Sequence, residues 1–210
     1  MKPLFKNVIS KSIKKNKKIQ TLKDLNAYSK IYSREILIDT ITPQIADEVD
    51  SLIRFWNAID DEDEVLFSER EPIKIYIDSY GGNINAALTI MDSIKISRTP
   101  IYTINIGTVY KESFFIYLVG HRRYTYQMAS FMFHKDTKQF DESETESSFF
   151  NYTSLCQKQE EELKRLLLDK TKITENQYEK HCKNDWWFSA DDAHKLSICN
   201  EVLRNHAYNK

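Results

Sequence analysis

The sequence predicts an α/β domain built on a largely parallel sheet. Short apolar runs typical of strands alternate along the chain with amphipathic helix patterns, and no segment is repeated. A repeated β-α-β order is satisfied most simply by parallel strands joined through crossover helices. The length of 210 residues, with 41% hydrophobic residues, is enough for one core. We therefore expect one domain with one site.

The first 25 residues form a basic segment. They contain eight lysines and a single acidic residue, Asp24. Such a composition favours a flexible extension over residues 1–25, followed by the folded domain over 26–210. A solvated tail, a docking arm and a pore-lining gate are the roles open to it.

The first β-α unit follows this extension. Arg34 to Asp39 predicts a strand, and Pro43 begins a helix. The acidic and polar stretch from Asp60 to Glu71 predicts an exposed loop. The apolar face of the helix consists of Ile45, Val49, Leu52, Ile53 and Trp56.

The second unit contains a glycine pair. Residues 73–77 alternate isoleucine with Lys74 and Tyr76, which predicts a strand. The pair at residues 81–82 turns the chain, and Asn83 is a suitable cap for a helix over residues 86–94.

Three further elements complete the globular part. A strand is expected over residues 101–106 and ends at Gly107. A helix over about 111–119 ends at Gly120, and a strand runs from residue 124 to 134.

A long helix is predicted from Tyr152 to Leu168, after the acidic run from Asp136 to Glu146. We expect this helix to project from the domain and to pack its leucines on another subunit. The alternative is an ordinary surface helix folded back on the sheet. The leucines are Leu163, Leu166, Leu167 and Leu168.

Composition excludes several function classes. The 30 basic and 31 acidic side chains nearly cancel, so neither nucleic acid nor an anionic membrane surface is expected as a partner. The three cysteines lie far apart and lack zinc-binding spacing, which favours reduced thiols in the cytoplasm. We expect no metal and no cofactor. The cysteines are Cys156, Cys182 and Cys199.

The glycine pair is the first candidate for chemistry. A Gly-Gly turn between a strand and a helix can direct backbone amides at a phosphate or at an oxyanion. The segment DSYGGNIN lacks both GxGxxG and a Gly-rich loop ending in Lys and Ser or Thr. An oxyanion site is therefore preferred to a phosphate site.

Five segments lie in register between about Tyr28 and Leu203. They are YSREILIDTITPQIADEVDSLIRFW, IKIYIDSYGGNINAALTIMDSI, IGTVYKESFFIYLVG, FMFHKD and NDWWFSADDA. Together they resemble ClpP, the proteolytic subunit of the ATP-dependent Clp protease. This resemblance implies the β-α-β spiral shared by ClpP and crotonase-like proteins, with a projecting handle over about residues 135–170.

The resemblance also implies a catalytic site with one departure. It assigns His134 and Asp185 as the histidine and aspartate of a serine-protease triad. With Gly107 and Gly120 aligned, Lys111 stands in the position of the nucleophilic serine. Lysine cannot supply the hydroxyl that serine attack requires, so loss of peptidase activity is expected.

The same comparison implies an oxyanion hole formed by the amides of Gly82 and Glu112, where Tyr80 replaces a proline of the family motif. Lys111 would need a counter-charge. Asp185 is the expected one, and Glu112 is the exposed alternative.

Three alternatives stay open at this point. Ser113 could act as a relocated nucleophile of an active endopeptidase, although two helical positions turn a side chain by about 200°. A lysine nucleophile or a Ser-Lys dyad is the second, and a crotonase-like acyl-CoA enzyme the third. The leading interpretation is a degenerate ClpP-like subunit, structural or regulatory, in homo- or hetero-oligomeric heptameric rings that dock a Clp-type AAA+ ATPase.

Overall fold

The computed structural model describes residues 32–134 and 146–204, with side chains of the second segment from Tyr152 onward. The chain divides after Glu35 into two compact units, and the second unit, Ile36–Lys210, contains nearly all of the sheet and the helices that cover it. The basic extension predicted over residues 1–25 and the acidic run at 136–145 lie outside the described residues. The boundary at residue 25 therefore stays a prediction.

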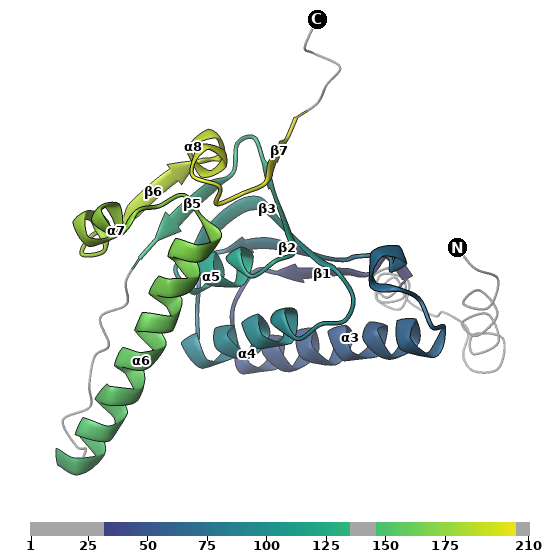
Figure 1. Ribbon diagram of the computed structural model, residues 1–210, viewed down its shortest axis with the longest axis horizontal. Coiled ribbons are helices and arrows are strands. Elements are labelled where there is room, and N and C mark those ends of the chain that lie inside the picture. The colour runs from purple at the N-terminus through teal and green to yellow at the C-terminus, as the bar shows by residue number, and fades with distance from the viewer. Residues whose placement is uncertain (1–31, 135–145, 205–210) are drawn as a thin grey trace, which may run out of the picture. The chain divides into compact units, whose positions relative to one another are not determined.

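The described strands form one seven-stranded sheet (Figure 1). Its main path is β1-β2-β3-β4-β7, while β5 pairs with β3 and with β6. The pairings of β3 with β2, β4 and β5, and of β4 with β7, are parallel, and β5 with β6 is antiparallel. The predicted α/β class is confirmed. The strands are β1 Glu35–Ile38, β2 Ile73–Ser79, β3 Ile101–Tyr110, β4 Arg122–Tyr126, β5 Ser130–Phe133, β6 Trp186–Ser189 and β7 Glu201–Leu203.

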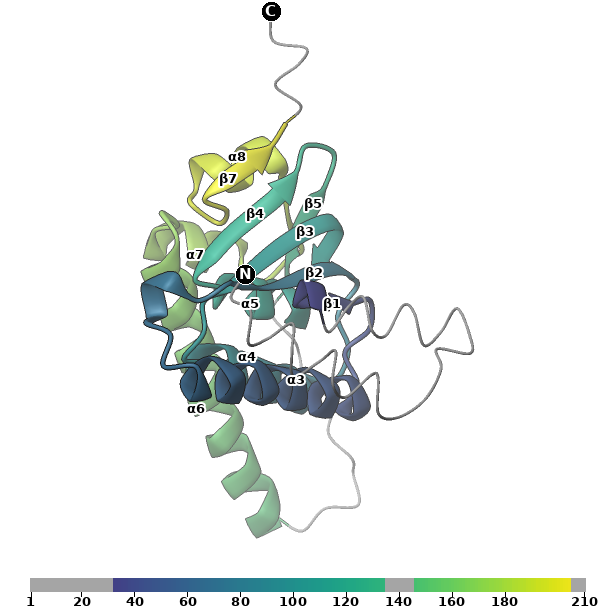
Figure 2. The same cartoon turned by 90° about the vertical axis from the view of Figure 1, so that its right-hand side faces the viewer.

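Two helices cover one face of this sheet. α3 and α4 lie side by side against the strands in both views (Figures 1 and 2). The isoleucines of β2 and Trp56 of α3 are fully buried in the core beneath them. The helices are α3 Pro43–Glu62, η1 Phe67–Glu69 (a 3-10 turn), α4 Ile84–Lys95, α5 Glu112–Leu118, α6 Glu146–Lys170, α7 Glu175–His181 and α8 Ala190–Lys195.

Both covering helices begin at a side-chain cap. Thr42 accepts a hydrogen bond from the Ile45 amide, and Pro43 occupies the first turn of α3. Asn83 caps α4 by accepting from the Ala86 amide at 2.9 Å. The cap at Asn83 confirms the helix start predicted after the glycine pair.

β3 continues beyond Gly107, where the sequence predicted its end. Its register with β2 shifts between Ile77 and Ser79, which marks a bulge beside Gly107. The strand then pairs with β5 over Thr108 to Tyr110, having paired with β4 over Tyr102 to Asn105. The second half of β3 thus extends to the residue before Lys111.

The strand predicted from residue 124 to 134 is in fact two strands. A turn at residues 127–129 separates β4 from β5, and the Ala129 amide closes it by donating to the Tyr126 carbonyl at 3.2 Å. Because both strands are parallel to β3, this break lets one segment pair with two successive parts of the same neighbour.

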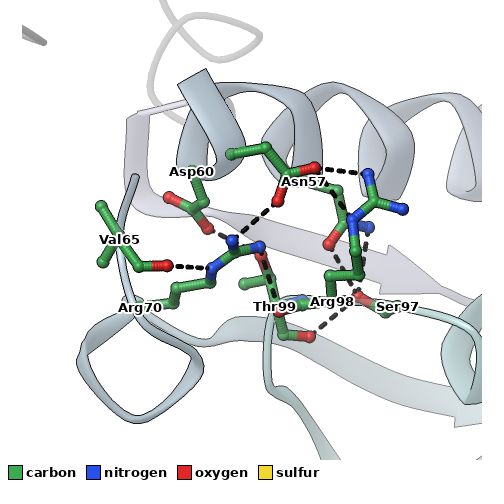
Figure 3. A network of polar contacts seen from close by, with 8 residues as sticks. Asn57, Asp60, Val65, Arg70, Ser97, Arg98 and Thr99 are labelled. Atoms are coloured by element: carbon green, nitrogen blue, oxygen red, sulfur yellow. Dashed lines mark hydrogen bonds and ion pairs between the residues drawn. The ribbon is translucent and has the colours of Figure 1, made fainter. Parts of the chain in front are cut away.

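The acidic stretch after α3 is more ordered than an exposed loop. Asp60 is buried and accepts from the Thr99 hydroxyl at 2.6 Å, so α3 extends to Glu62. Asp61 accepts from Arg70 and Arg98. Figure 3 shows both arginines in this network, where Arg70 also donates to the Val65 carbonyl. These two arginines hold the pKa of the Asp61 carboxyl below its usual value. The loop prediction was wrong at its start, where α3 continues to Glu62 and Asp60 is buried. Residues 63–71 are mostly exposed, as predicted, and contain the short η1 turn.

The leucines of α6 pack on their own domain. Leu167 is fully buried, and Leu163, Leu166 and Leu168 are half-buried against the core. The expectation that they project toward another subunit is therefore wrong for this half of the helix. The exposed apolar residues lie nearer its start, at Tyr152 and Leu155, where α6 extends away from the sheet (Figure 1).

Arg123 fixes the other end of α6. Its guanidinium is buried and donates to the carbonyls of Lys170, Ser197 and Ile198. Burial lowers the pKa of this arginine. The last carbonyls of a helix lack intrahelical partners, so a cation here satisfies one of them.

Candidate active site

Lys111 lies at a sharp turn between β3 and α5. Its backbone has φ 54° and ψ −123°, a region that residues other than glycine rarely adopt. The Lys111 amide donates to the Met132 carbonyl of β5 at 3.1 Å, which ties the turn to the sheet. A strained strand-to-helix turn that presents one side chain is the geometry of a nucleophile elbow.

His134 and Asp185 are brought together by the β5–β6 pair. Phe133 and Trp186 are opposite each other in this antiparallel ladder, so the residue after one strand meets the residue before the other. Nδ1 of His134 lies 2.6 Å from Oδ1 of Asp185, and both side chains are partly exposed. A carboxylate in this position orients the imidazole and fixes its tautomer.

Lys111 and His134 line the same pocket. Its remaining wall is largely apolar and comes from α4, α5, β5, α6 and α7. Lys111 and His134 thus reach one pocket from the carboxyl ends of β3 and β5, and Asp185 contacts His134. An acyl-transfer site needs a nucleophile, a base and an orienting acid in this kind of proximity.

The expected ion pair of Lys111 with Asp185 is not formed. Within residues 32–134 and 146–204, Lys111 makes no ion pair with a carboxylate, and its side chain is exposed. Asp185 instead contacts His134. An exposed ammonium group is hydrated by water, so it does not require a protein counter-charge.

Glu112 is buried rather than exposed. It is 6% exposed, and its Oε2 accepts a hydrogen bond from the Gly82 amide at 2.8 Å. Gly81 and Gly82 have φ of 106° and 156°, so the turn relies on glycine geometry. Tyr80, which is 73% exposed, lies edge-on to Tyr110 beside this turn.

The sequence did not predict the hydrogen bond between the Glu112 carboxyl and the Gly82 amide. The resemblance assigned only its backbone amide to the site, and its carboxyl to the surface. The available signal was an acidic residue directly after Lys111, near the glycine pair that follows the neighbouring strand β2.

Ser113 is fully buried beneath the elbow. Its hydroxyl donates toward the carbonyls of Tyr110 at 2.7 Å and Ser79 at 3.0 Å. Both contacts are to the backbone, so the hydroxyl joins α5 to β2 and β3. This geometry gives Ser113 a structural role, since both acceptors belong to the backbone and neither is His134.

Two kinds of feature are absent from the part of the chain that the structure describes. No group of three or more His, Cys, Asp or Glu in residues 32–134 and 146–204 has an arrangement suited to a metal ion. None of the described helices has the length and apolarity needed to cross a bilayer. The three cysteines are all buried as free thiols, and burial raises the pKa of Cys199 to about 11.

Sequence comparison relates most of the chain to one family. A family model described as Clp protease matches residues 20–206. The ATP-dependent Clp protease proteolytic subunit 2 of Borreliella burgdorferi is 26% identical over 136 residues, which are 64% of this chain and 68% of the relative. The protein of the same name from Treponema denticola is 26% identical over 140 residues, 66% of this chain and 69% of the relative.

Comparison with solved structures gives the same fold. A mutant of ClpP1 from Listeria monocytogenes superposes with a TM-score of 0.70 at 24% sequence identity, covering 87% of this chain and 98% of that chain. The ClpP-like fold implied by the sequence is confirmed, and the crotonase-like alternative is not favoured. Taken with the match over residues 20–206, these findings show that the chain belongs to the Clp protease family.

Proposed function

We propose that this chain is a catalytically degenerate ClpP-like subunit that serves a structural or regulatory role in a ring. The observation that carries the proposal is the residue at the elbow. The Lys111 backbone has the geometry of a nucleophile elbow, and Lys111 lines a pocket together with His134. His134 in turn contacts Asp185. A base and its orienting acid are thus present without a hydroxyl for them to activate.

The chemistry of the triad explains why this exchange abolishes peptidase activity. The imidazole removes a proton from a hydroxyl, and the resulting oxygen attacks the peptide carbonyl. The ammonium group of a lysine has no lone pair for this attack. Removing the serine from a related triad lowers turnover by about a millionfold, which leaves no useful proteolysis.

The alternative of a relocated nucleophile has little support from the geometry. Ser113 is fully buried, and both acceptors of its hydroxyl are backbone carbonyls. Bringing it to His134 would require α5 to unwind its first turn. A Ser-Lys dyad is disfavoured for the same reason.

The relatives are named as proteolytic subunits of an ATP-dependent protease. We extend this to the present chain as ring assembly with ClpP-like subunits, identical or different, and docking of a Clp-type ATPase. The exposed Tyr152 and Leu155 near the start of α6 are suited to contacts between subunits.

Labelling with a fluorophosphonate tests the degenerate assignment. The purified chain and its His134→Ala variant should show the same background labelling and the same absence of peptide-ester hydrolysis. An active serine protease treated in parallel verifies the reagent. Labelling of the unmodified chain at Ser113, lost in His134→Ala, would show an active relocated site and refute the proposal.

Native mass spectrometry tests the assembly. The chain should form rings alone or when co-expressed with a catalytically active ClpP-like subunit. A stable monomer under both conditions would exclude a ring role while leaving the loss of catalysis untouched.

A further inference from the structure

We propose that Glu112 is a second and independent block on catalysis, because its carboxylate occupies the position where a substrate oxyanion would bind. This inference rests on the proposed function, in which Lys111 is the first block. It adds a role for the side chain of Glu112 that is separate from the absence of a hydroxyl at residue 111.

The contact with Gly82 has the geometry of an occupied oxyanion hole. Donors that stabilise an oxyanion lie about 2.7–3.1 Å from it. Oε2 of Glu112 lies 2.8 Å from the Gly82 nitrogen, within this range. A carboxylate oxygen carries the same kind of charge as a tetrahedral intermediate, so it is a suitable substitute for one.

Of the two glycine amides in the turn, that of Gly82 faces the carboxyl group of Glu112. The Gly81 amide is directed elsewhere, since it donates to the Ser79 hydroxyl at 3.2 Å. The Gly82 amide donates to Glu112. A Cβ added at Gly81 would collide with Oε2 of Glu112, so the glycine leaves room for the carboxylate against the turn.

The carboxylate also lies in the pocket where the substrate would be. Glu112 lines it together with Lys111 and His134 and is 6% exposed. A peptide carbonyl that approached residue 111 would meet the buried carboxyl group of Glu112 in place of a free N–H group. Restoring the hydroxyl alone therefore does not restore the site.

Revertants separate the two blocks. Lys111→Ser should be labelled by a fluorophosphonate about a hundredfold more slowly than Lys111→Ser with Glu112→Met, the effect of one oxyanion donor. Methionine cannot accept a hydrogen bond from the Gly82 amide as the carboxylate does, so its flexible side chain is free to move out of the oxyanion position. Lys111→Ser with Glu112→Gln is the matched control, because the glutamine carbonyl can still accept from Gly82, and it should resemble Lys111→Ser alone.

The outcomes distinguish the two proposals. Labelling of Lys111→Ser at the rate of the Met double variant would overturn the second block and leave the proposed function intact. Labelling of the unmodified chain would overturn the proposed function itself.

A binding measurement tests the occupied site without any catalysis. In Glu112→Ala, with Lys111 retained, the freed Gly82 amide should bind formate. Formate should then raise the melting temperature of this variant more than chloride does at equal ionic strength. The unmodified chain and the exposed control Glu161→Ala should respond equally to both salts. Equal responses in all three proteins would contradict the inference, including when no revertant is labelled.

Discussion

The two halves of the site differ in what holds them in place. In the half containing His134 and Asp185, two partly exposed side chains contact each other at the end of the β5–β6 ladder. The other half, comprising the glycine pair and the elbow at Lys111, depends on backbone conformation and buried hydrogen bonds. The first half keeps two side chains suited to catalysis, His134 and Asp185. The second half keeps a backbone suited to catalysis, but the side chains of Lys111 and Glu112 are not. Backbone geometry and chemical competence can therefore be lost separately.

The largest effect is expected from crowding the glycine turn. Gly82→Ala places a Cβ against the backbone of Ile41, which cannot move aside without disturbing the start of α3. The free energy of unfolding should fall by about 2–4 kcal/mol, measured by urea denaturation. Gly81→Ala is the control. Its φ of 106° is also unfavourable for alanine, but the nearest atom to its Cβ belongs to the movable side chain of Glu112, so the variant should cost less. If Gly82→Ala left the free energy of unfolding unchanged, the glycine turn would not depend on its backbone conformation.

Removing the buried hydroxyl beneath the elbow should have a smaller effect. Ser113→Ala deprives the carbonyls of Tyr110 and Ser79 of their shared donor. We expect a loss of about 1–2 kcal/mol in the free energy of unfolding, again by urea denaturation. The same exchange at the exposed Ser154 should change nothing measurable. An unchanged stability in Ser113→Ala would argue against a structural role for this hydroxyl.

Relaxing the elbow should stabilise the protein. Lys111→Gly removes the steric conflict of a side chain at φ 54°, ψ −123°, and should raise the free energy of unfolding by about 1 kcal/mol. Lys95→Gly in the last turn of α4 is the matched control and should lower it by about 0.5–1 kcal/mol. Both are measured by thermal and urea unfolding. Equal destabilisation by the two variants would mean that the turn at Lys111 is unstrained.

The smallest change in stability is expected in the side-chain half. Asp185→Asn weakens a partly exposed contact, so the free energy of unfolding should change by less than about 1 kcal/mol. In the Lys111→Ser, Glu112→Met background the same change should abolish labelling, because the imidazole loses its orientation. A large loss of stability with labelling retained would reverse the contrast between the two halves.

The sequence was informative wherever local pattern decides structure. The alternating isoleucines of β2, the cap at Asn83 and the order of strands and helices follow from neighbours a few residues apart. The resemblance then implied that His134 and Asp185 meet, and the ladder between β5 and β6 brings them together.

The sequence was less informative where distant partners decide. Glu112 is buried because Gly82, thirty positions earlier, donates to it. Asp60 is buried because Thr99 does the same across 39 positions. β3 passes Gly107 because β5 supplies new partners beyond the bulge. Charged residues are usually exposed, and a glycine often ends a strand. A hydrogen-bond donor or a strand from a distant part of the chain can reverse either tendency.

The hydrogen bonds that hold the elbow have a consequence for how such a protein diverges. The Lys111 amide bonds to Met132, and the Ser113 hydroxyl bonds to Tyr110 and Ser79. None of these contacts uses a side-chain atom of residue 111. Selection for folding and selection for chemistry therefore act on different atoms at this position. A lineage can exchange the residue at the elbow while the subunit continues to fold. The fold can therefore be inherited after the reaction has been lost.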